Sequence, residues 1–244
     1  MPKKRILKFL VVWLLATLLV SCFDTREEIW ISADSSGAAR IQVIFPAKAA
    51  TLYGGETGVR EMIEAFFDGN SAFSSHTISS SQENGRMQLD ITCTFENALD
   101  LKNALGEANL EKLPKGGTGF AGETDVTFSG TDLHFKRLVN LPKAMPGAIF
   151  LPESQLRGHS LTTIIHLPNR ATSHNATLTA NEGRTLIWET PLASAFKKPI
   201  ESRFTMPLPI PWLYISIVAV LILILSLSLV FYLRGKFRRR ITLR

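Results

Sequence analysis

The chain has 244 residues, a formal net charge of +6, 45% hydrophobic residues and only two cysteines. This length allows one domain of ordinary size or two small ones, and the cysteine count excludes a disulfide-rich secreted scaffold. The positive charge does not indicate a nucleic-acid partner, because ten of the 27 basic residues lie in the terminal segments 1–22 and 234–244, and the rest of the chain holds 17 basic residues against all 21 acidic ones.

Residues 1–21 have the features of an export signal, with a basic start, an apolar run from Phe9 to Val20 and small or apolar residues before Cys22. The run has about 12 residues, whereas a membrane-spanning helix needs roughly 20, so the pattern predicts a removable lipoprotein signal peptide. Leu19-Val20-Ser21-Cys22 resembles the bacterial lipobox, whose cysteine is lipidated and becomes the acylated N-terminus. An ordinary signal peptide and an uncleaved signal anchor are the alternatives.

Residues 22–205 are expected to form one extracytoplasmic domain. Alternating apolar residues and turn residues such as Asn84-Gly85 predict a series of hairpins, and helical spacing of apolar residues predicts amphipathic helices over 58–68 and 98–110. The predicted fold class is therefore α+β, a largely antiparallel sheet covered by two amphipathic helices, with one transmembrane helix at the C-terminus.

Two apolar stretches of this domain are candidates for contact with a ligand. The first helix carries Met62, Phe66 and Phe67, and the Pro-punctuated connection 141–152 carries Met145, Ile149 and Phe150. Such a connection is either a lip that touches lipid or lines an apolar pocket, or an irregular segment that covers the sheet. A ligand-binding domain would hold a continuous apolar cavity between the two helices and the sheet, whereas a partner-binding domain would have a filled core and an exposed patch or sheet edge.

No catalytic, metal-binding or cofactor-binding motif is recognisable in the chain. The five histidines lack the spacing of metal ligands, and Cys93 lies on the apolar face of a predicted strand, which is typical of a buried small side chain. We therefore expect that the protein is not an enzyme and uses no cofactor. Enzymatic activity is the third option, after ligand binding and partner binding.

The C-terminal part of the sequence predicts attachment to a membrane. Residues 206–211 alternate with proline and predict a polyproline II stalk, and residues 212–233 are uncharged and strongly apolar, which predicts a transmembrane helix. The basic residues of the tail 234–244 place it in the cytoplasm by the positive-inside rule, so that the domain 22–205 would lie outside the cytoplasm.

These features together resemble one known family. A lipobox cysteine followed by a hairpin, an extracytoplasmic α+β domain, the stretches Leu167-Pro168, Asn175-Ala176 and 183–188, and a C-terminal apolar helix with a basic tail are similar to the LppM-type bacterial lipoproteins. The resemblance implies an envelope protein with lipid or glycolipid binding as its activity, and it supplies no catalytic residues.

The sequence thus predicts a bacterial envelope lipoprotein, lipidated at Cys22, whose domain binds a lipid-like or apolar ligand at the membrane surface. Membrane lipid is the expected partner, and another envelope protein is a second candidate partner. Nucleic acid is not expected as a partner. The alternative function is that of a non-enzymatic scaffold or a module that binds a protein partner in the cell envelope.

Overall fold

The computed structural model of the protein describes residues 23–101, 122–144, 151–208 and 216–226. The chain divides into two compact units, Met1–Leu208 and Pro209–Arg244. Among the described residues, the first unit contains both sheets and every helix except that of residues 216–226.

Seven strands form the larger sheet, which we call sheet A. Their order is β3-β4-β2-β1-β7-β10-β9, and all neighbours are antiparallel except β1 and β7, which run parallel. Their bounds are β1 Asp24–Ile31, β2 Gly37–Pro46, β3 Ser75–Glu83, β4 Arg86–Phe95, β7 Ser160–His166, β9 Leu178–Ala180 and β10 Thr185–Pro191.

Four further strands form sheet B, in the order β5-β6-β11-β8 with antiparallel neighbours. They are β5 Glu123–Ser129, β6 Asp132–Val139, β8 Ser173–His174 and β11 Ile200–Pro207. The long helix α3, Gly55–Asp68, connects the first hairpin to the second. Short helical turns fill other connections: α2 Ala47–Ala50, η1 Thr51–Tyr53, η2 Ala98–Asp100, α7 Leu141–Ala144, α8 Glu153–Leu156, η4 Asn181–Gly183 and α9 Leu192–Ala195.

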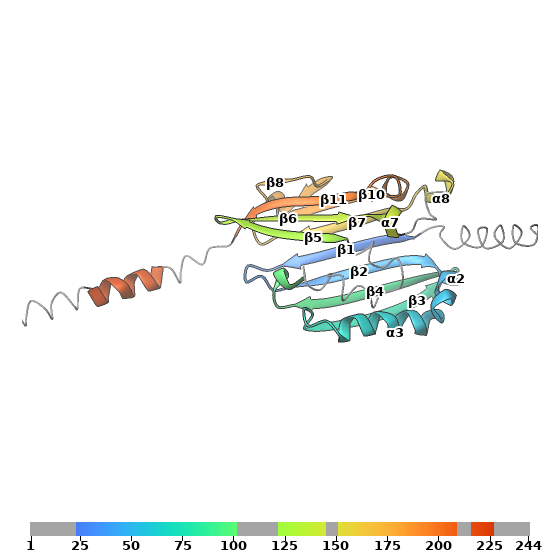
Figure 1. Cartoon of the computed structure of the whole chain (residues 1–244), viewed down its shortest axis with the longest axis horizontal. Coiled ribbons are helices and arrows are strands. Elements are labelled where there is room, and N and C mark those ends of the chain that lie inside the picture. The colour runs from blue at the N-terminus through green and yellow to red at the C-terminus, as the bar shows by residue number, and fades with distance from the viewer. Residues whose placement is uncertain (1–22, 102–121, 145–150, 209–215, 227–244) are drawn as a thin grey trace, which may run out of the picture. The chain divides into compact units, whose positions relative to one another are not determined.

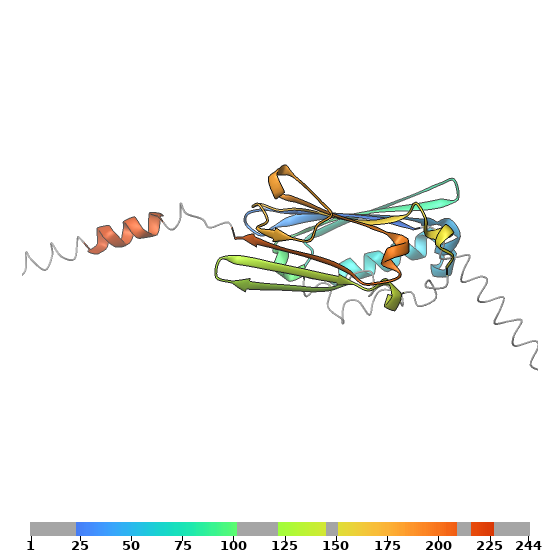
Figure 2. The same cartoon turned by 90° about the horizontal axis from the view of Figure 1, so that it is seen from above.

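Sheet B and α3 lie side by side on the same face of sheet A, as Figures 1 and 2 show. We call this the inner face. The β-strand register explains it, since Ile91 of β4 is level with Ile41 of β2, and the inward positions continue through β1 to β7 and β10. The half of sheet A around β4 therefore packs against α3, and the half around β10 packs against sheet B.

Four clusters of buried apolar side chains fill these contacts. The cluster beneath α3 joins Phe66 and Phe67 to Ile78, Ile91 and Cys93, and a smaller one joins Val59 of α3 to Met87 and Leu89. Between the two sheets, Leu186 and Trp188 pack against Phe204 and Met206. An ion pair between Glu27 of β1 and Arg137 of β6 also joins the sheets, and the two side chains are only 19% and 12% exposed.

Local sequence signals account for the hairpins. Asn84 and Gly85 have φ values of 51° and 74°, which a two-residue turn between antiparallel strands requires and which Asn-Gly adopts readily. In β4, the five inward residues Met87, Leu89, Ile91, Cys93 and Phe95 are all buried, as the alternation predicts.

The predicted fold class is wrong. The sequence predicts one largely antiparallel sheet under two amphipathic helices, but the structure has two sheets, a parallel pair within the larger one, and sheet B in the place of a second covering helix. Of the predicted helix 98–110 only the first turn is described, with the Asn97 side chain accepting a hydrogen bond from the Leu99 N–H, and the remainder lies outside the described residues. The error arises because alternation identifies strands but not their partners, and β1 and β7 are separated by about 130 residues of chain.

The predicted transmembrane helix is likewise not found. Within the described ranges, no helix has both the length and the hydropathy to cross a membrane. Residues 216–226 of the second unit are helical, and the other residues of the predicted span 212–233 lie outside those ranges.

Candidate functional site

The start of β1 lies in a cluster of apolar side chains at one end of the first unit. Phe23, the residue that follows the lipobox cysteine, is only 8% exposed and meets Phe196 edge to face at 6.3 Å between ring centroids. We call this group the Phe23 cluster; its buried members are Phe23, Leu141, Leu151, Leu156, Leu192, Ala195 and Phe196. Residue 23 is therefore packed into the folded domain, with no linker between them.

Polar contacts fix the next residue as well. Asp24 accepts a hydrogen bond from the Ser160 N–H at 3.2 Å, and its carboxylate lies 3.0 Å from His159 Nδ1 and 3.1 Å from an Arg86 guanidinium nitrogen. Burial by itself would raise the pKa of Asp24, but the hydrogen bonds from His159 and Ser160 and the charge of His159 outweigh it and hold the pKa below its usual value. Asp24 therefore holds the beginning of β1 to its neighbour β7 and, beyond β2, to the beginning of β4.

The apolar connection 141–152 begins and ends at the same place. Leu141 is fully buried and Leu151 is 7% exposed, and both belong to the Phe23 cluster. The two ends of the connection are thus held beside residue 23. Of the candidate contact residues, Met145, Ile149 and Phe150 lie on this connection but outside the described residues.

The other three candidate contact residues lie elsewhere. Phe66 and Phe67 are buried beneath α3, at ring-centroid distances of 6.2 and 4.9 Å from Phe73, and Met62 on the same helix is half-buried. Phe66 and Phe67 belong to a group of the core that is separate from the Phe23 cluster. The structure therefore does not bring α3 and the ends of the 141–152 connection into one site.

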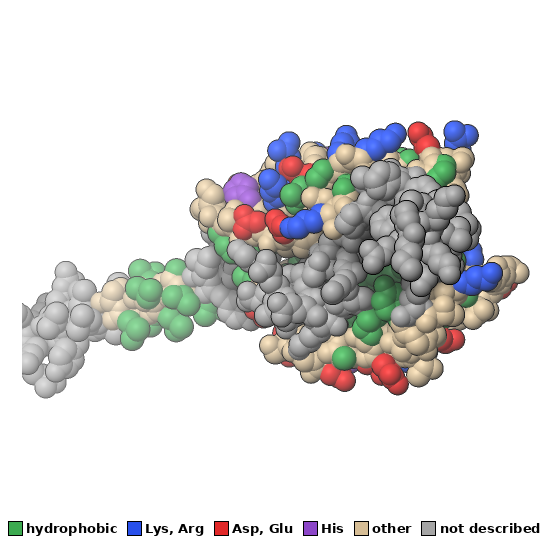
Figure 3. Space-filling view, turned by 45° about the vertical axis from the view of Figure 1, so that its right-hand side comes forward, with side chains coloured by type: hydrophobic (Ala, Val, Ile, Leu, Met, Phe, Trp, Pro, Cys, Tyr) green, Lys and Arg blue, Asp and Glu red, His purple; other side chains and the backbone are tan. Residues whose placement is uncertain are grey.

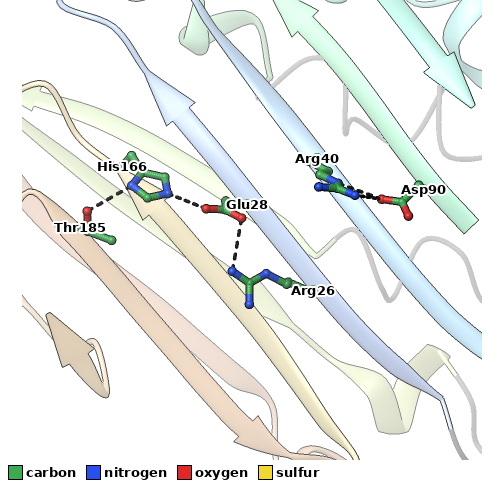
Figure 4. A network of polar contacts seen from close by, with 6 residues as sticks. All are labelled: Arg26, Glu28, Arg40, Asp90, His166 and Thr185. Carbon is green, nitrogen blue, oxygen red and sulfur yellow. Dashed lines mark hydrogen bonds and ion pairs between the residues drawn. The ribbon is translucent and has the colours of Figure 1, made fainter. Parts of the chain in front are cut away.

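Solvated polar side chains cover the outer face of sheet A, which lies opposite sheet B and α3 (Figure 2). Figure 4 shows two networks on this face. In the first, His166 lies 2.9 Å from Glu28 and 3.1 Å from Thr185, and Glu28 also meets Arg26 at 3.4 Å. In the second, Arg40 lies 2.8 Å from Asp90.

Both carboxylates of these networks are held in the ionised form. Burial would raise the pKa of Glu28 and of Asp90, but hydrogen bonds from His166 to Glu28 and from Gln88 and Arg40 to Asp90 keep each pKa below its usual value. A carboxylate of this kind is a poor proton donor at neutral pH. Sequence reasoning missed this face because the paired residues come from strands far apart in the chain.

One aromatic side chain stands among these polar groups. Trp30 is 38% exposed and stacks on His166 with ring centroids 5.3 Å apart and an angle of 6° between the rings.

Cys93 is buried, and burial raises the pKa of its thiol to about 11. A thiol of this kind is neutral and shielded, in agreement with its predicted role as a small apolar side chain. Among the residues that the structure describes, no three His, Cys, Asp or Glu side chains come together as a metal site would require.

Two open depressions of about 670 and 570 Å³ adjoin each other, and Arg170, Ala171 and Thr172 line both of them. Neither is lined by the candidate contact residues. Because residues 102–110 and 145–150 are not described, the predicted apolar cavity between two helices and the sheet stays a prediction.

No family model matches the chain, and no curated protein matches it. Among solved structures, the folded domain of the Mycobacterium tuberculosis LppM protein, determined by NMR, is 12% identical with a TM-score of 0.49, over 78% of this chain and 91% of that one. The Danio rerio Fcho1 Mu homology domain with bound Eps15 peptide is 11% identical with a TM-score of 0.26, over 78% of this chain and 80% of that one. The first of these proteins is of the type that the sequence resembles. Likenesses with TM-scores below 0.5 carry no argument about function, and membership of that family stays a prediction.

Proposed function

We propose that the protein is an extracytoplasmic lipoprotein of the bacterial envelope, anchored through Cys22, and that its domain binds a lipid-like ligand at the membrane surface. The observation that carries the proposal is the Phe23 cluster, which holds both ends of the apolar connection 141–152 beside the residue next to Cys22. An acyl group on Cys22 would keep this end of the domain at the bilayer, because β1 starts two residues later at Asp24.

Chemistry supports binding rather than catalysis. The connection carries Met145, Ile149 and Phe150, large apolar side chains suited to an acyl chain, in a segment of the chain that begins and ends at the bilayer side of the domain. The carboxylates with displaced pKa values in the described residues are all lowered, so none of them is prepared for general acid catalysis at neutral pH. We therefore propose a binding protein that uses no cofactor.

A second candidate function rests on the outer face of sheet A. The exposed Trp30, stacked on His166 and surrounded by ion pairs, is the kind of rigid aromatic side chain that interfaces use as an anchor. This observation favours a module that binds another envelope protein. The two functions use different surfaces: lipid binding uses the connection 141–152 beside the Phe23 cluster, and partner binding uses the outer face of sheet A. One experiment can therefore separate them.

The separating experiment is photo-crosslinking of the full-length protein in liposomes that contain a phospholipid with a diazirine in its acyl chain. Lipid binding at the Phe23 cluster predicts crosslinked peptides from the connection 141–152 and none from the turn 32–36 at the opposite end of β1. Crosslinks spread equally over both regions, or absent from the connection, would overturn the proposed function and favour the partner-binding one.

A further inference from the structure

The larger of the two open depressions lies at the end of the strands opposite Phe23. It is lined by the connection that follows β7, by β8 and β9, and by the turn η4 that precedes β10. Because β7 runs parallel to β1, its last residue, His166, lies beside Trp30 at the far end of β1. The depression has a volume of about 670 Å³, within the roughly 300 to 1,000 Å³ of small-ligand sites, and shares no lining residue with the Phe23 cluster. It is therefore a separate candidate site.

Arg170 brings a positive charge to this depression. Among the described residues, it is the only lysine or arginine in the lining. The backbone after it is held on both sides, because the Ala171 N–H donates to the Gly183 carbonyl at 3.0 Å and the Thr172 N–H donates to the Thr205 carbonyl at 2.8 Å. The Arg170 side chain is exposed and has no ion pair or hydrogen bond within the described part of the chain. Its guanidinium is thus available to a ligand.

The turn η4 leaves room for the Arg170 side chain. Its three residues, Asn181, Glu182 and Gly183, have φ values of 51°, 58° and 83°, a left-handed conformation that residues other than glycine adopt only at a cost. A Cβ atom on Gly183 would lie 3.2 Å from Arg170 Cγ and 3.5 Å from its Nε. The arginine stem therefore lies across the glycine. Strained backbone of this kind is concentrated at sites that position groups for binding.

Further polar groups line the depression beside Arg170. They are the hydroxyls of Ser173 and Thr179, the imidazole of His174 and the carboxylate of Glu182. Charged side chains of both signs are interspersed on the upper part of the domain in Figure 3, so exposed charge by itself does not identify a site. This depression differs because its cation and its carboxylate, Arg170 and Glu182, do not pair with each other in the described chain. A ligand with both an anionic group and a hydrogen-bond donor would satisfy the two together.

We propose that this depression binds a small phosphate ester that also carries a hydroxyl group, with the phosphate on Arg170 and the hydroxyl donating to Glu182. A guanidinium binds phosphate oxygens through two parallel hydrogen bonds, and the remaining phosphate oxygens can accept from Ser173 and Thr179. The proposal goes beyond the proposed lipid-binding function and does not depend on it. Because an anchor at Cys22 would hold the other end of the strands at the bilayer, we expect a soluble phosphate ester rather than a lipid headgroup.

The test is isothermal titration calorimetry of the full-length protein in micelles of a neutral detergent, with glycerol 3-phosphate and inorganic phosphate as probes. We expect saturable binding of glycerol 3-phosphate, and Arg170→Gln should weaken it about tenfold, because a charged hydrogen-bond partner is lost. Arg184→Gln is the matched control, since Arg184 is also exposed and next to η4 but does not line the depression. No saturable binding to the wild-type chain, or an equal loss in the two variants, would overturn the proposal.

Glu182→Gln tests the part of the ligand that carries the hydroxyl. The substitution removes repulsion from both probes, but it takes the charged acceptor only from glycerol 3-phosphate, so the preference for glycerol 3-phosphate over inorganic phosphate should fall several-fold. An unchanged preference would overturn the assignment of the hydroxyl to Glu182. Phosphatidylglycerol added to the micelles distinguishes the two sources of a phosphate ester. We expect no competition with glycerol 3-phosphate, and competition would overturn the expectation of a soluble ligand.

Discussion

At the scale of single residues, the structure gives Asp24 the role of fixing the start of β1. Its carboxylate binds Ser160, His159 and Arg86, so replacement by Asn keeps the shape but removes the charge that these partners share. We expect Asp24→Asn to lower the free energy of unfolding at pH 7 by about 1 kcal/mol, since the site is partly solvated and its charge-assisted hydrogen bonds are screened. Urea unfolding followed by tryptophan fluorescence measures the change.

The effect of this substitution should depend on pH. Because the pKa of Asp24 is lower in the folded chain than its ordinary value of 3.8, the carboxylate stabilises the fold above that value, and this contribution is lost as the pH falls through the folded pKa. The wild-type chain and Asp24→Asn should therefore differ at pH 7 and converge in acid. A difference that does not shrink as the pH falls through the folded pKa would show that the charge of Asp24 is not its cause.

The site residues could be predicted from sequence only where their chemistry is local. The buried position of Cys93 follows from its place in an alternating strand. Cys22 and the apolar residues of 141–152 stand out by composition, and their roles stay predictions. The Arg26-Glu28-His166-Thr185 network could not be found in this way, because its members come from β1, β7 and β10 and become neighbours only through strand pairing. The ion pair between Glu27 and Arg137 depends in addition on the packing of two sheets.

At the scale of elements, α3 carries both buried core residues and Met62, a half-buried candidate for ligand contact. Phe67 is 6% exposed beneath the helix, whereas Met62 is half-buried on it. We expect Phe67→Ala to destabilise the domain by about 3 to 5 kcal/mol, because it leaves a cavity in a packed cluster. Met62→Ala should cost about 1 kcal/mol, in proportion to the smaller area that it removes from contact.

Thermal unfolding of both variants, with circular dichroism as the signal, compares the two costs directly. If Met62 contacts a ligand, Met62→Ala should reduce lipid retention without loss of the fold, and Phe67→Ala should reduce both together. A Phe67→Ala variant as stable as the wild-type chain would contradict the assignment of Phe67 to the core.

The elements themselves were more predictable than their arrangement. Asn84-Gly85 and the alternation of β4 predict a hairpin that the structure confirms. The apolar spacing of 58–68 predicts most of α3, although the helix begins earlier, at Gly55. The strand β11 was missed, although Ile200, Ser202, Phe204 and Met206 alternate, because the prolines that follow favoured a stalk from residue 206. Met206 and Pro207 belong to this strand.

At the scale of the whole first unit, the chain enters and leaves the sheets at opposite ends of the strands. The polypeptide enters β1 through Phe23 at one end of the strands and leaves β11 at the opposite end, where the Leu208 N–H donates to the Thr131 carbonyl. A lipid anchor at Cys22 would attach the end of the domain that holds the apolar Phe23 cluster.

The central claim is that this domain binds lipid, and native mass spectrometry of the full-length protein, purified in detergent from a bacterial envelope, tests it most directly. We expect a species that carries one noncovalent lipid per chain, in addition to any covalent group on Cys22, and that loses this lipid on collisional activation. A spectrum that contains only the chain with its covalent modification, under conditions that preserve the fold, would contradict the account.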